Sequence, residues 1–526
     1  MSRATRTTGS SRRRAVVSTV GAFAVAISTT IAMSGHAAAA PGYDATSDVN
    51  SMYSTTRYTG VRDWWRAGYT GDGVDVAVID TGVTPVDGLA DPNKIVYGPD
   101  LSLDAPADNL HNLDANGHGT FMAGIIAGRG SGADPSSYAG DQTTFLGVAP
   151  DARIVSVKVG ASDGAVDVSQ VIAAIDWVVQ HRNDHGLNIR VLNLSYGTDS
   201  AQPYEVDPLA YAVEQAWKAG IFVVAATGNA GYQFKTGTLT NPAYDPKIFA
   251  VGATDSQGTM SMSDDTVAPF SSTGSNGRYV DVANPGSHIV SLRVPGSYID
   301  QTFGNTGYVS DGLFRGSGTS EAAAITSGEA ALAIQQRPDI TPGQLKKLFL
   351  GSARSLNSYS SVQQGQGEVD MSAMLRAKTP CAPKQWNTID WSTGIGSIEL
   401  SRGTQHLVDD GVPLMGEQDI FAQPFDARAM AQLEMGQASW SGGDWNGSTW
   451  SGSGWDGHTW SGHTWSGHTW SGTDWSGHTW SGNTWSASTW SGGDWSSHTW
   501  SGNTWSASTW SSSTWSGSGW LGATWH

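Results

Sequence analysis

Short apolar runs rich in β-branched residues alternate with amphipathic segments from roughly Tyr58 to Ala377. This alternation is typical of βαβ units, in which helices join parallel strands and cover the sheet. We expect strands at Val74 to Ile79, Ile154 to Val159, Ile189 to Leu194, Ile221 to Ala225 and Phe249 to Val251. A region of about 320 residues can bury one large core, so the pattern predicts a single three-layer α/β domain on a parallel sheet.

Three segments between or after these strands carry helix signals. Val166 to Gln180 and Pro208 to Ala219 have apolar residues at helical spacing, and Gly220 suits the left-handed position that often follows a helix. A later helix is expected to begin at Pro342, with Thr341 as its cap. Such helices can cover the strands as a three-layer arrangement requires.

The first forty residues have the layout of a bacterial secretory signal. Five arginines and no acidic residue precede an apolar stretch, Ala15 to Met33. This stretch leads to the small residues Ala37 to Ala40. We predict a cleaved signal peptide at 1–39, a short segment at 40–57 and an extracellular mature protein. Polar residues within the apolar stretch disfavour a retained membrane anchor. The three consecutive arginines at 12–14 leave general and twin-arginine export both open.

The mature chain is strongly acidic and almost free of cysteine. Removing the five signal arginines from a formal net charge of −18 leaves about −23. This charge repels nucleic acid and anionic membrane surfaces, so we expect neither as a partner. Cys381 is the single cysteine, so an internal disulfide is excluded.

Two segments place a reactive side chain at the end of an expected element. VAVIDTG, Val76 to Gly82, puts Asp80 at the carboxyl end of a strand, although local turn bonding alone often selects Asp there. NGHGTFMAGIIAG, Asn116 to Gly128, sets His118 between two glycines before a small-residue helix. Those glycines allow close backbone approach and suit a His facing a cleft, although a helix-capping His is the alternative.

A third segment, GSGTSEAAA from Gly316 to Ala324, delivers Ser320 to the start of an alanine-rich helix. Its hydroxyl can be exposed there, and its backbone N–H is one of the donors left unsatisfied at a helix start. A serine in this place can equally be a simple N-cap. The chain order Asp80, His118, Ser320 makes the three segments more specific together than each is alone.

These motifs resemble the subtilisin-like (subtilase) serine proteases over roughly Gly71 to Gly328. AATGNAG resembles the family's oxyanion segment, with Asn229 as donor, and LNLSYG resembles its substrate-binding strand. NPAYDPKIFAVGA, Asn241 to Ala253, resembles the segment beside the primary specificity pocket. PFSSTG and VDVANPG, within Pro269 to Gly286, resemble structural strands of the family.

The resemblance implies a serine endopeptidase that acts on polypeptides. Ser320 is the implied nucleophile, His118 the general base, Asp80 its orienting carboxylate and Asn229 an oxyanion donor. The substrate-binding residues implied by the resemblance are Leu194, Ser195, Tyr196, Gly197, Ala226, Thr227 and Gly228. We expect a monomeric catalytic domain that requires no cofactor.

Calcium is a further ligand to consider, because subtilases often bind it. Asp104, Asp108 and Asp114 are loop carboxylates that could ligate Ca²⁺. Their spacing defines no site, so the sequence favours solvated loop carboxylates and locates no metal.

Several features depart from the family pattern. Glu321 follows the nucleophile where Met or Ala is usual, and Ala324 and Asn284 replace a common Pro and Ala. We expect the Glu321 carboxylate to raise the pKa of His118 or to slow acylation. Only about twenty residues, including Pro41 to Arg57, separate the signal from the catalytic region, too few for a folding prodomain. The alternative hypothesis is a surface- or polysaccharide-binding protein with a vestigial protease domain.

The remainder of the chain differs in composition from the α/β region. Residues 378–439 contain four prolines and no clear period, which indicates a linker or small appendage. From Trp440 to Trp525, Trp recurs every fifth residue, mostly as W-S-G-x-x. The predicted domains are thus 1–39 signal peptide, 40–57 short segment, 58–377 peptidase, 378–439 linker or appendage and 440–526 repeat.

A five-residue period fits neither a regular helix nor a flat strand. A square β-solenoid with five residues per side could align the rings, and a disordered low-complexity tail is the alternative. In either form, exposed indoles suggest adhesion to a cell wall or polysaccharide, or self-association. Regularly placed histidines, such as His458 and His463, make metal binding a minor alternative.

Overall fold

The structure is a computed structural model of the chain. It describes residues 42–107, 109–231, 239–274, 277–356, 358–382, 389–409 and 412–450, together with short strands between residues 460 and 524. All of them belong to one compact unit, His36–His526. The predicted signal peptide and the candidate ligand Asp108 lie outside the described residues.

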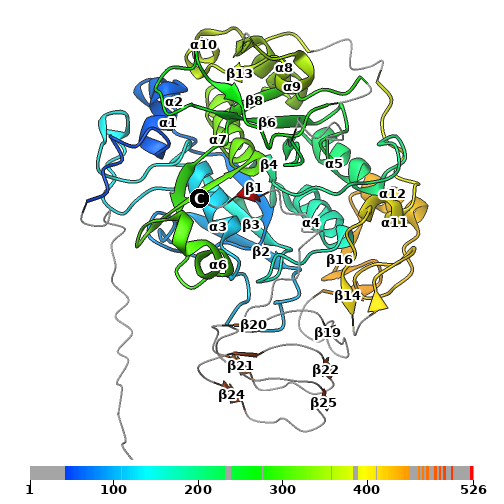
Figure 1. Cartoon of the computed structure of the whole chain (residues 1–526). Helices are drawn as coiled ribbons and strands as arrows, with labels where there is room; N and C mark the ends of the chain where they lie inside the picture. The colour runs from blue at the N-terminus through cyan, green and yellow to red at the C-terminus, as the bar shows by residue number, and fades with distance from the viewer. Residues whose placement is uncertain are drawn as a thin grey trace, which may run out of the picture. The chain divides into compact units, whose positions relative to one another are not determined.

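A ten-stranded, mostly parallel sheet forms the centre of the α/β region (Figure 1). Its strand order is β12-β13-β8-β6-β5-β4-β1-β3-β2, with β7 paired to β6. Only the β12–β13 and β6–β7 pairs are antiparallel. The strands are β1 (Asp75–Asp80), β2 (Ile95–Asp100), β3 (Arg153–Lys158), β4 (Ile189–Leu194), β5 (Phe222–Ala226), β6 (Phe249–Asp255), β7 (Thr266–Val267), β8 (Val282–Pro285), β12 (Ala353–Arg354) and β13 (Glu368–Val369).

All five expected strands are present, as β1, β3, β4, β5 and β6. Every residue of β1 and β5 is buried, which explains why these segments are continuous apolar runs rather than alternating patterns. β1 is one residue later than expected, so Asp80 is its last residue and lies at its carboxyl end.

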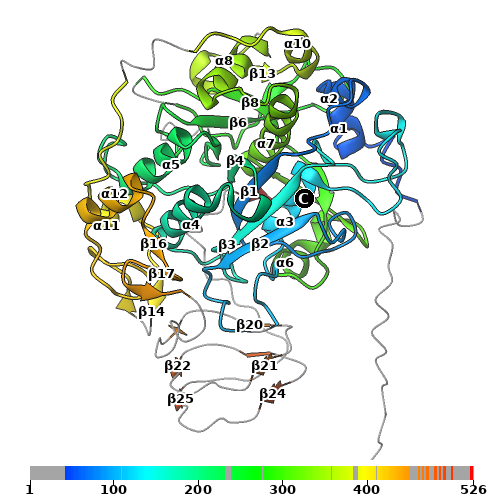
Figure 2. The ribbon, with the colours of Figure 1, turned by 180° about the vertical axis from the view of Figure 1, so that it is seen from behind.

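Helices pack on this sheet in pairs, α3 with α7 and α4 with α5 (Figures 1 and 2). The expected caps are present: Thr341 accepts the N–H of Gln344 in a capping box, and Pro342 begins its helix. The helices of this region are α1 (Met52–Tyr58), α2 (Val61–Arg66), α3 (His118–Ala127), α4 (Val168–His181), α5 (Pro208–Lys218), α6 (Tyr298–Gly307), α7 (Thr319–Gln336), α8 (Pro342–Ser352), α9 (Ser361–Gln364) and α10 (Met371–Arg376). Among the described residues, none of these helices is long and apolar enough to cross a bilayer.

A small antiparallel sheet leads the chain into α7. β11 (Leu313–Gly318) pairs with β9 (Ile289–Leu292) and with β10 (Tyr308–Ser310). Near its end, β11 also pairs with β26 (Gly522–Thr524). Because α7 begins directly after β11, this sheet fixes the direction from which Ser320 enters the core.

Elements between residues 398 and 441 pack against α4 and α5 (Figures 1 and 2). Trp440 donates to the carbonyl of Ala173 at 2.8 Å, and Trp445 donates to the Asp176 carboxylate at 2.8 Å. With Trp450 these indoles are buried, unlike the exposed rings expected throughout the repeat. The elements here are α11 (Ile398–Arg402), β14 (Val408–Asp409), β15 (Val412–Pro413), α12 (Ala427–Met435), β16 (Trp440–Ser441), β17 (Asp444–Trp445) and β18 (Ser448–Thr449).

Short strands later in the repeat pair in parallel with partners twenty residues away, which is four repeats. Trp460 is in register with Trp480, and Trp480 with Trp500. The paired strands are β19 (Trp460–Ser461), β20 (Trp465–Ser466), β21 (Trp470–Gly472), β22 (Thr479–Ser481), β23 (Trp485–Ser486), β24 (Trp490–Gly492) and β25 (Thr499–Ser501).

Candidate active site

Asp80 and His118 meet in a buried contact at the carboxyl end of β1. His118 is the first residue of α3, and its Nδ1 lies 2.8 Å from Asp80 Oδ1. Asp80 is 0% and His118 2% exposed. A Cβ at Gly119 would lie 2.2 Å from the carbonyl oxygen of Gly82, so glycine is required for this close approach. The sequence interpretation of the flanking glycine is therefore confirmed at this position.

Thr81 and Asp114 fasten the start of α3 to the end of β1. Thr81 donates its N–H to Asp80 at 2.8 Å and its hydroxyl to Asp114 Oδ1 at 2.8 Å. Asp114 also accepts the backbone N–H groups of Gly117 and Thr120, each at 2.7 Å. Asp114 is thus a buried carboxylate that accepts backbone N–H groups at the start of α3, not the solvated loop carboxylate that the sequence favoured.

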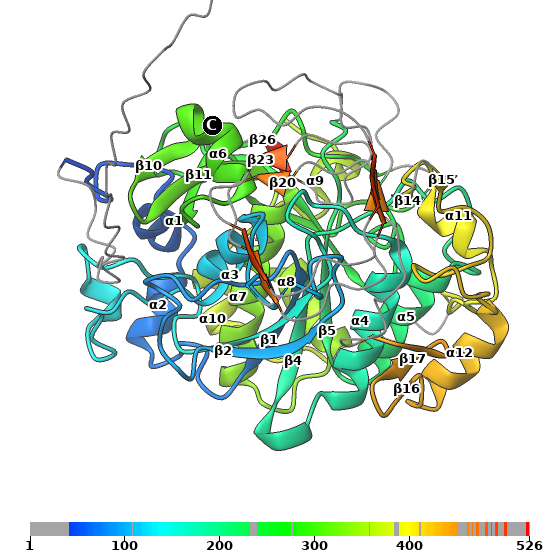
Figure 3. The same ribbon diagram turned by 90° about the horizontal axis from the view of Figure 1, so that it is seen from below.

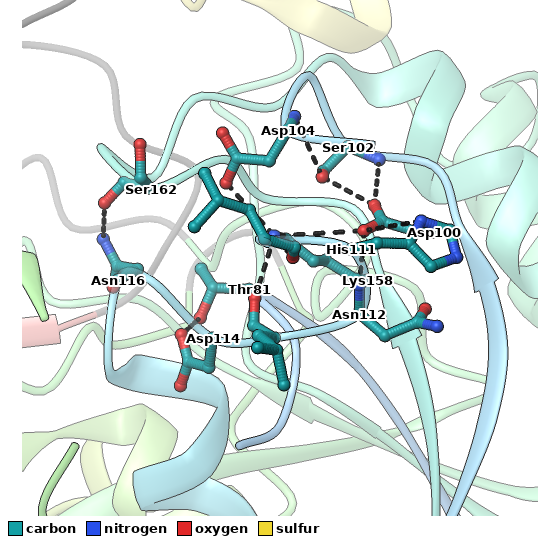
Figure 4. Close-up of polar contacts among 12 residues, drawn as sticks. Thr81, Asp100, Ser102, Asp104, His111, Asn112, Asp114, Asn116, Lys158 and Ser162 are labelled. Atoms are coloured by element: carbon teal, nitrogen blue, oxygen red, sulfur yellow. Dashed lines mark hydrogen bonds and ion pairs between the residues drawn. The ribbon is translucent and has the colours of Figure 1, made fainter. Parts of the chain in front are cut away.

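The loop before α3 is held by a buried lysine, shown in Figure 4. Lys158 Nζ donates to Asp104 Oδ2 at 3.1 Å and to the carbonyl oxygens of Leu110 at 3.0 Å and Leu113 at 2.9 Å. The Asp100 carboxylate lies 3.9 Å from the same nitrogen. Burial disfavours the charge on Lys158, but Asp104 and Asp100 raise its pKa above the usual value.

Asp104 is therefore an ion-pair partner within the fold rather than a solvated carboxylate. Burial raises its pKa to about 6, against the opposing effect of Lys158. In the part of the chain that the structure describes, no group of three or more His, Cys, Asp or Glu side chains forms a candidate metal site. The calcium site that the sequence left open is therefore not located among the described residues.

Ser320 is the second residue of α7, which packs against α3. The side chain is 0% exposed, and its Oγ has no hydrogen-bond partner within the described residues. Its carbonyl oxygen accepts a long contact of 3.5 Å from Ser195 Oγ. The structure thus joins Asp80 to His118 but forms no hydrogen bond at the Ser320 hydroxyl. Catalytic hydrogen bonds are often loose before substrate binds.

Asn229 lies beside the start of α7. Its Oδ1 accepts the backbone N–H of Thr319 at 3.0 Å and the Thr319 hydroxyl at 3.1 Å. The same hydroxyl accepts the N–H of Gly228 at 3.2 Å. Because the carboxamide oxygen accepts from Thr319, Nδ2 is the group of Asn229 that could act as an oxyanion donor. Neither Thr319 nor Thr81 was singled out from the sequence, where each reads as an ordinary loop threonine.

The predicted substrate-binding residues lie at the carboxyl ends of two adjacent parallel strands. Leu194 ends β4, and Ser195, Tyr196 and Gly197 follow it; Ala226 ends β5, and Thr227 and Gly228 follow it. Thr198, the residue after Gly197, exchanges two backbone hydrogen bonds of 3.0 and 2.9 Å with Asn241. The strand resembling a substrate-binding edge therefore lies beside the loop that resembles the specificity-pocket segment.

Glu321 is a buried carboxyl group next to the nucleophile candidate. Burial raises its pKa to about 7, and His118 opposes that rise. Within the described residues its two oxygens find no hydrogen-bonding side chain. Burial disfavours the charged form of His118, but Asp80 and Glu321 raise the His118 pKa above its usual value. The expected effect of Glu321 on His118 therefore has the predicted sign.

Comparison with known proteins adds an independent finding. A model of the subtilase family matches residues 71–368. The chain is 38% identical over 286 residues to serine protease AprX of Bacillus subtilis (strain 168), covering 53% of this chain and 61% of AprX. It is 30% identical over 307 residues to subtilisin DY of Bacillus licheniformis, covering 58% of this chain and 92% of subtilisin DY.

Among solved structures, the crystal structure of MycP1 with the N-terminal propeptide removed is 27% identical, with a TM-score of 0.46. That match covers 62% of this chain and 98% of the MycP1 chain. The present chain spans 61% of the length of AprX, less than two thirds of that relative. Because the family model matches more than half of its residues, the chain belongs to the subtilase family.

Proposed function

We propose that the chain is a secreted serine endopeptidase that hydrolyses peptide bonds through an acyl-enzyme intermediate. The single observation that carries the proposal is the buried 2.8 Å contact between His118 Nδ1 and Asp80 Oδ1. It is the contact that holds a general base in the tautomer needed to accept a proton at Nε2. Family membership supports the same activity.

The proposed reaction begins when Ser320 Oγ attacks the scissile carbonyl carbon while His118 Nε2 takes the hydroxyl proton. Asp80 stabilises the imidazolium that forms, and the N–H of Ser320 with Asn229 Nδ2 binds the oxyanion. His118 then donates the proton to the leaving amine. Water, activated by the same imidazole, hydrolyses the ester and restores the Ser320 hydroxyl.

Hydrolysis of an unfolded protein such as casein tests this proposal. We expect Ser320→Ala to abolish activity while leaving the melting temperature close to that of the native chain. Ser327→Ala is the matched control, because Ser327 lies on the same helix and donates to Asn193 at 2.9 Å instead of facing substrate. Full activity in Ser320→Ala would contradict the proposal.

The competing hypothesis of a vestigial protease domain is not favoured. Asp80, His118, Ser320 and Asn229 are all present, and Asp80 and His118 are hydrogen-bonded. The proposed reaction requires no cofactor, and a polypeptide is its only obligatory partner. The proposal makes the catalytic region active as a monomer, which sedimentation at assay concentration tests.

We also propose that the distal repeat binds a cell wall or polysaccharide outside the cell. Parallel pairing at an offset of four repeats supports a coil with five residues per side. Such a coil would stack equivalent Trp positions in rows suited to flat sugar rings. Pull-down of the full chain onto cell-wall material tests this, compared with a chain ending at Trp450, which keeps the three buried indoles. Equal retention of both chains would contradict it.

A further inference from the structure

The segment Ser397–Gln405, which contains α11, lies beyond the family-matched residues 71–368. It nevertheless packs against the α/β region, where α11 contacts α4 and α5 (Figure 3). Ser401 and Arg402 are both 0% exposed. Their burial shows that this segment is part of the folded unit rather than a loose connection.

Ser401 joins two parts of the candidate substrate site. Its carbonyl oxygen accepts the hydroxyl of Thr198, the residue after the predicted substrate-binding segment Leu194–Gly197, at 2.6 Å. Its own hydroxyl accepts Asn241 Nδ2 at 3.1 Å and donates to Asp207 at 3.0 Å. Ser401 therefore links the end of the substrate-binding strand to the loop beside the predicted specificity pocket.

Arg402 ties the same segment to the start of α4. Its Nε lies 2.6 Å from Asp167 Oδ1, and both side chains are fully buried. Asp167 is also the N-cap of α4. A fully buried, directional ion pair fixes the position of the backbone that carries it, because separating the charges would leave each uncompensated.

Gln405 reaches the substrate-binding strand itself. Its Nε2 donates to the carbonyl oxygen of Gly197 at 3.4 Å. Its Oε1 is buried and has no hydrogen-bond partner within the described ranges. A backbone carbonyl accepts two hydrogen bonds, so Gly197 can keep Gln405 while it pairs with an extended peptide.

We infer that Gln405 is a positioning residue for length specificity, whose Nε2 donor holds the Gly197 carbonyl in place for pairing with an extended polypeptide. Ser401 and Arg402 are positioning residues that hold it there. The inference rests on the proposed function and narrows it: substrates long enough to lie along Gly197 are favoured over short peptides. The substrate site would then be completed by the segment Ser397–Gln405, which lies outside the family-matched residues 71–368.

Peptide p-nitroanilides lengthened from two to five residues test this inference. We expect Gln405→Ala to lower kcat/KM for the longest peptides roughly 2- to 10-fold, as loss of one hydrogen bond predicts. The change should lie in KM, with kcat kept, and the shortest peptides should be unaffected. Gln405→Glu cannot donate to Gly197 and should show the same pattern. Gln432→Ala, an exposed glutamine in α12, is the control.

An equal loss on short and long peptides, a loss in kcat alone, or no change would each overturn the inference. If Gln405→Ala fails to fold, Gln405→Met, which keeps the side-chain volume, replaces it in the same series. Absence of hydrolysis by the native chain would contradict the proposed function instead. Failure of the inference and failure of the proposed function are thus distinguishable.

Discussion

The two ends of the candidate triad differ in how their polar groups are satisfied. At the His118 end, Asp80, Thr81 and Asp114 form a continuous series of buried hydrogen bonds. At the Ser320 end, neither the Ser320 hydroxyl nor the Glu321 carboxyl group finds a hydrogen-bonding side chain among the described residues.

This difference indicates that one end of the triad orients the imidazole, whereas the other end reacts with the substrate. The imidazole is held by a network that does not need to change during a catalytic cycle, which lowers the cost of reaching the reactive geometry. The serine end keeps its polar groups available, at a cost in stability, for a substrate or a proton to satisfy. Substitutions at the two ends should therefore have distinguishable effects.

The largest loss of activity is expected when Asp80 no longer orients His118. An Asp80→Asn side chain keeps the volume but favours the wrong imidazole tautomer, so kcat should fall about 10⁴-fold. Asp75→Asn is the matched control, because Asp75 lies at the other end of β1 and pairs with Arg153. Steady-state hydrolysis measures both, and a loss under tenfold in Asp80→Asn would contradict the assigned role.

Lys158→Met tests whether the buried charge network supports the oriented end. The change leaves Asp100 and Asp104 buried without their ammonium partner, so the free energy of unfolding should fall by about 3–5 kcal/mol. Lys347→Met, at an exposed position on α8, should change stability little. Urea unfolding at pH 7 measures the difference, and equal stability of the two variants would show that the network contributes nothing.

Asn229→Ala tests the serine end. It removes the proposed oxyanion donor, so we expect the fold to persist and kcat to fall by roughly 100- to 1,000-fold. The bonds to Thr319 are lost as well, so thermal melting must accompany the kinetics. Unchanged turnover would exclude Asn229 from the site.

Glu321→Gln tests the serine end through the pH dependence of stability and of the reaction rate. Burial raises the pKa of Glu321 from 4.5 to about 7, so its stabilising neutral form is lost as pH rises through that range. By linkage, the native chain should lose on the order of 3 kcal/mol between pH 4.5 and 8 through this group, and the glutamine variant should not. The variant should also lower the pKa of His118, moving the acid limb of the pH–rate profile to lower pH.

Glu329→Gln is the control for that experiment. Glu329 is buried on the same helix and burial raises its pKa to about 8, but it bonds Asn284 rather than facing His118. It should change the pH dependence of stability and leave the pH–rate profile in place. Identical profiles for the native chain and Glu321→Gln would show that the two residues are not coupled.

Much of the α/β region could be predicted because its signals are local. The buried strands are continuous apolar runs, and Thr341 with Pro342 marks the start of α8. Asp80 and His118 were predicted together from their positions at element ends, and the structure brings them into contact. The Glu321 effect on His118 followed from adjacency to the nucleophile.

The remaining features depend on partners distant in sequence. Lys158 and Asp104 are separated by 54 residues, and Arg402 and Asp167 by 235, so no local pattern marks either buried pair. Trp440 and Trp445 follow the same period as the later tryptophans, yet they are buried against α4. Their contacts are with residues 267 and 269 positions earlier in the chain, which the repeat pattern alone cannot encode.

Labelling with a fluorophosphonate, followed by mass spectrometry of the modified peptide, tests the central claim most directly. The account predicts a single adduct on Ser320, formed by the native chain and abolished by Ser320→Ala. His118→Ala should suppress the same adduct, because the hydroxyl then lacks its base. Absence of labelling in the folded native chain, or an adduct on another serine, would contradict the assignment of Ser320 as the nucleophile.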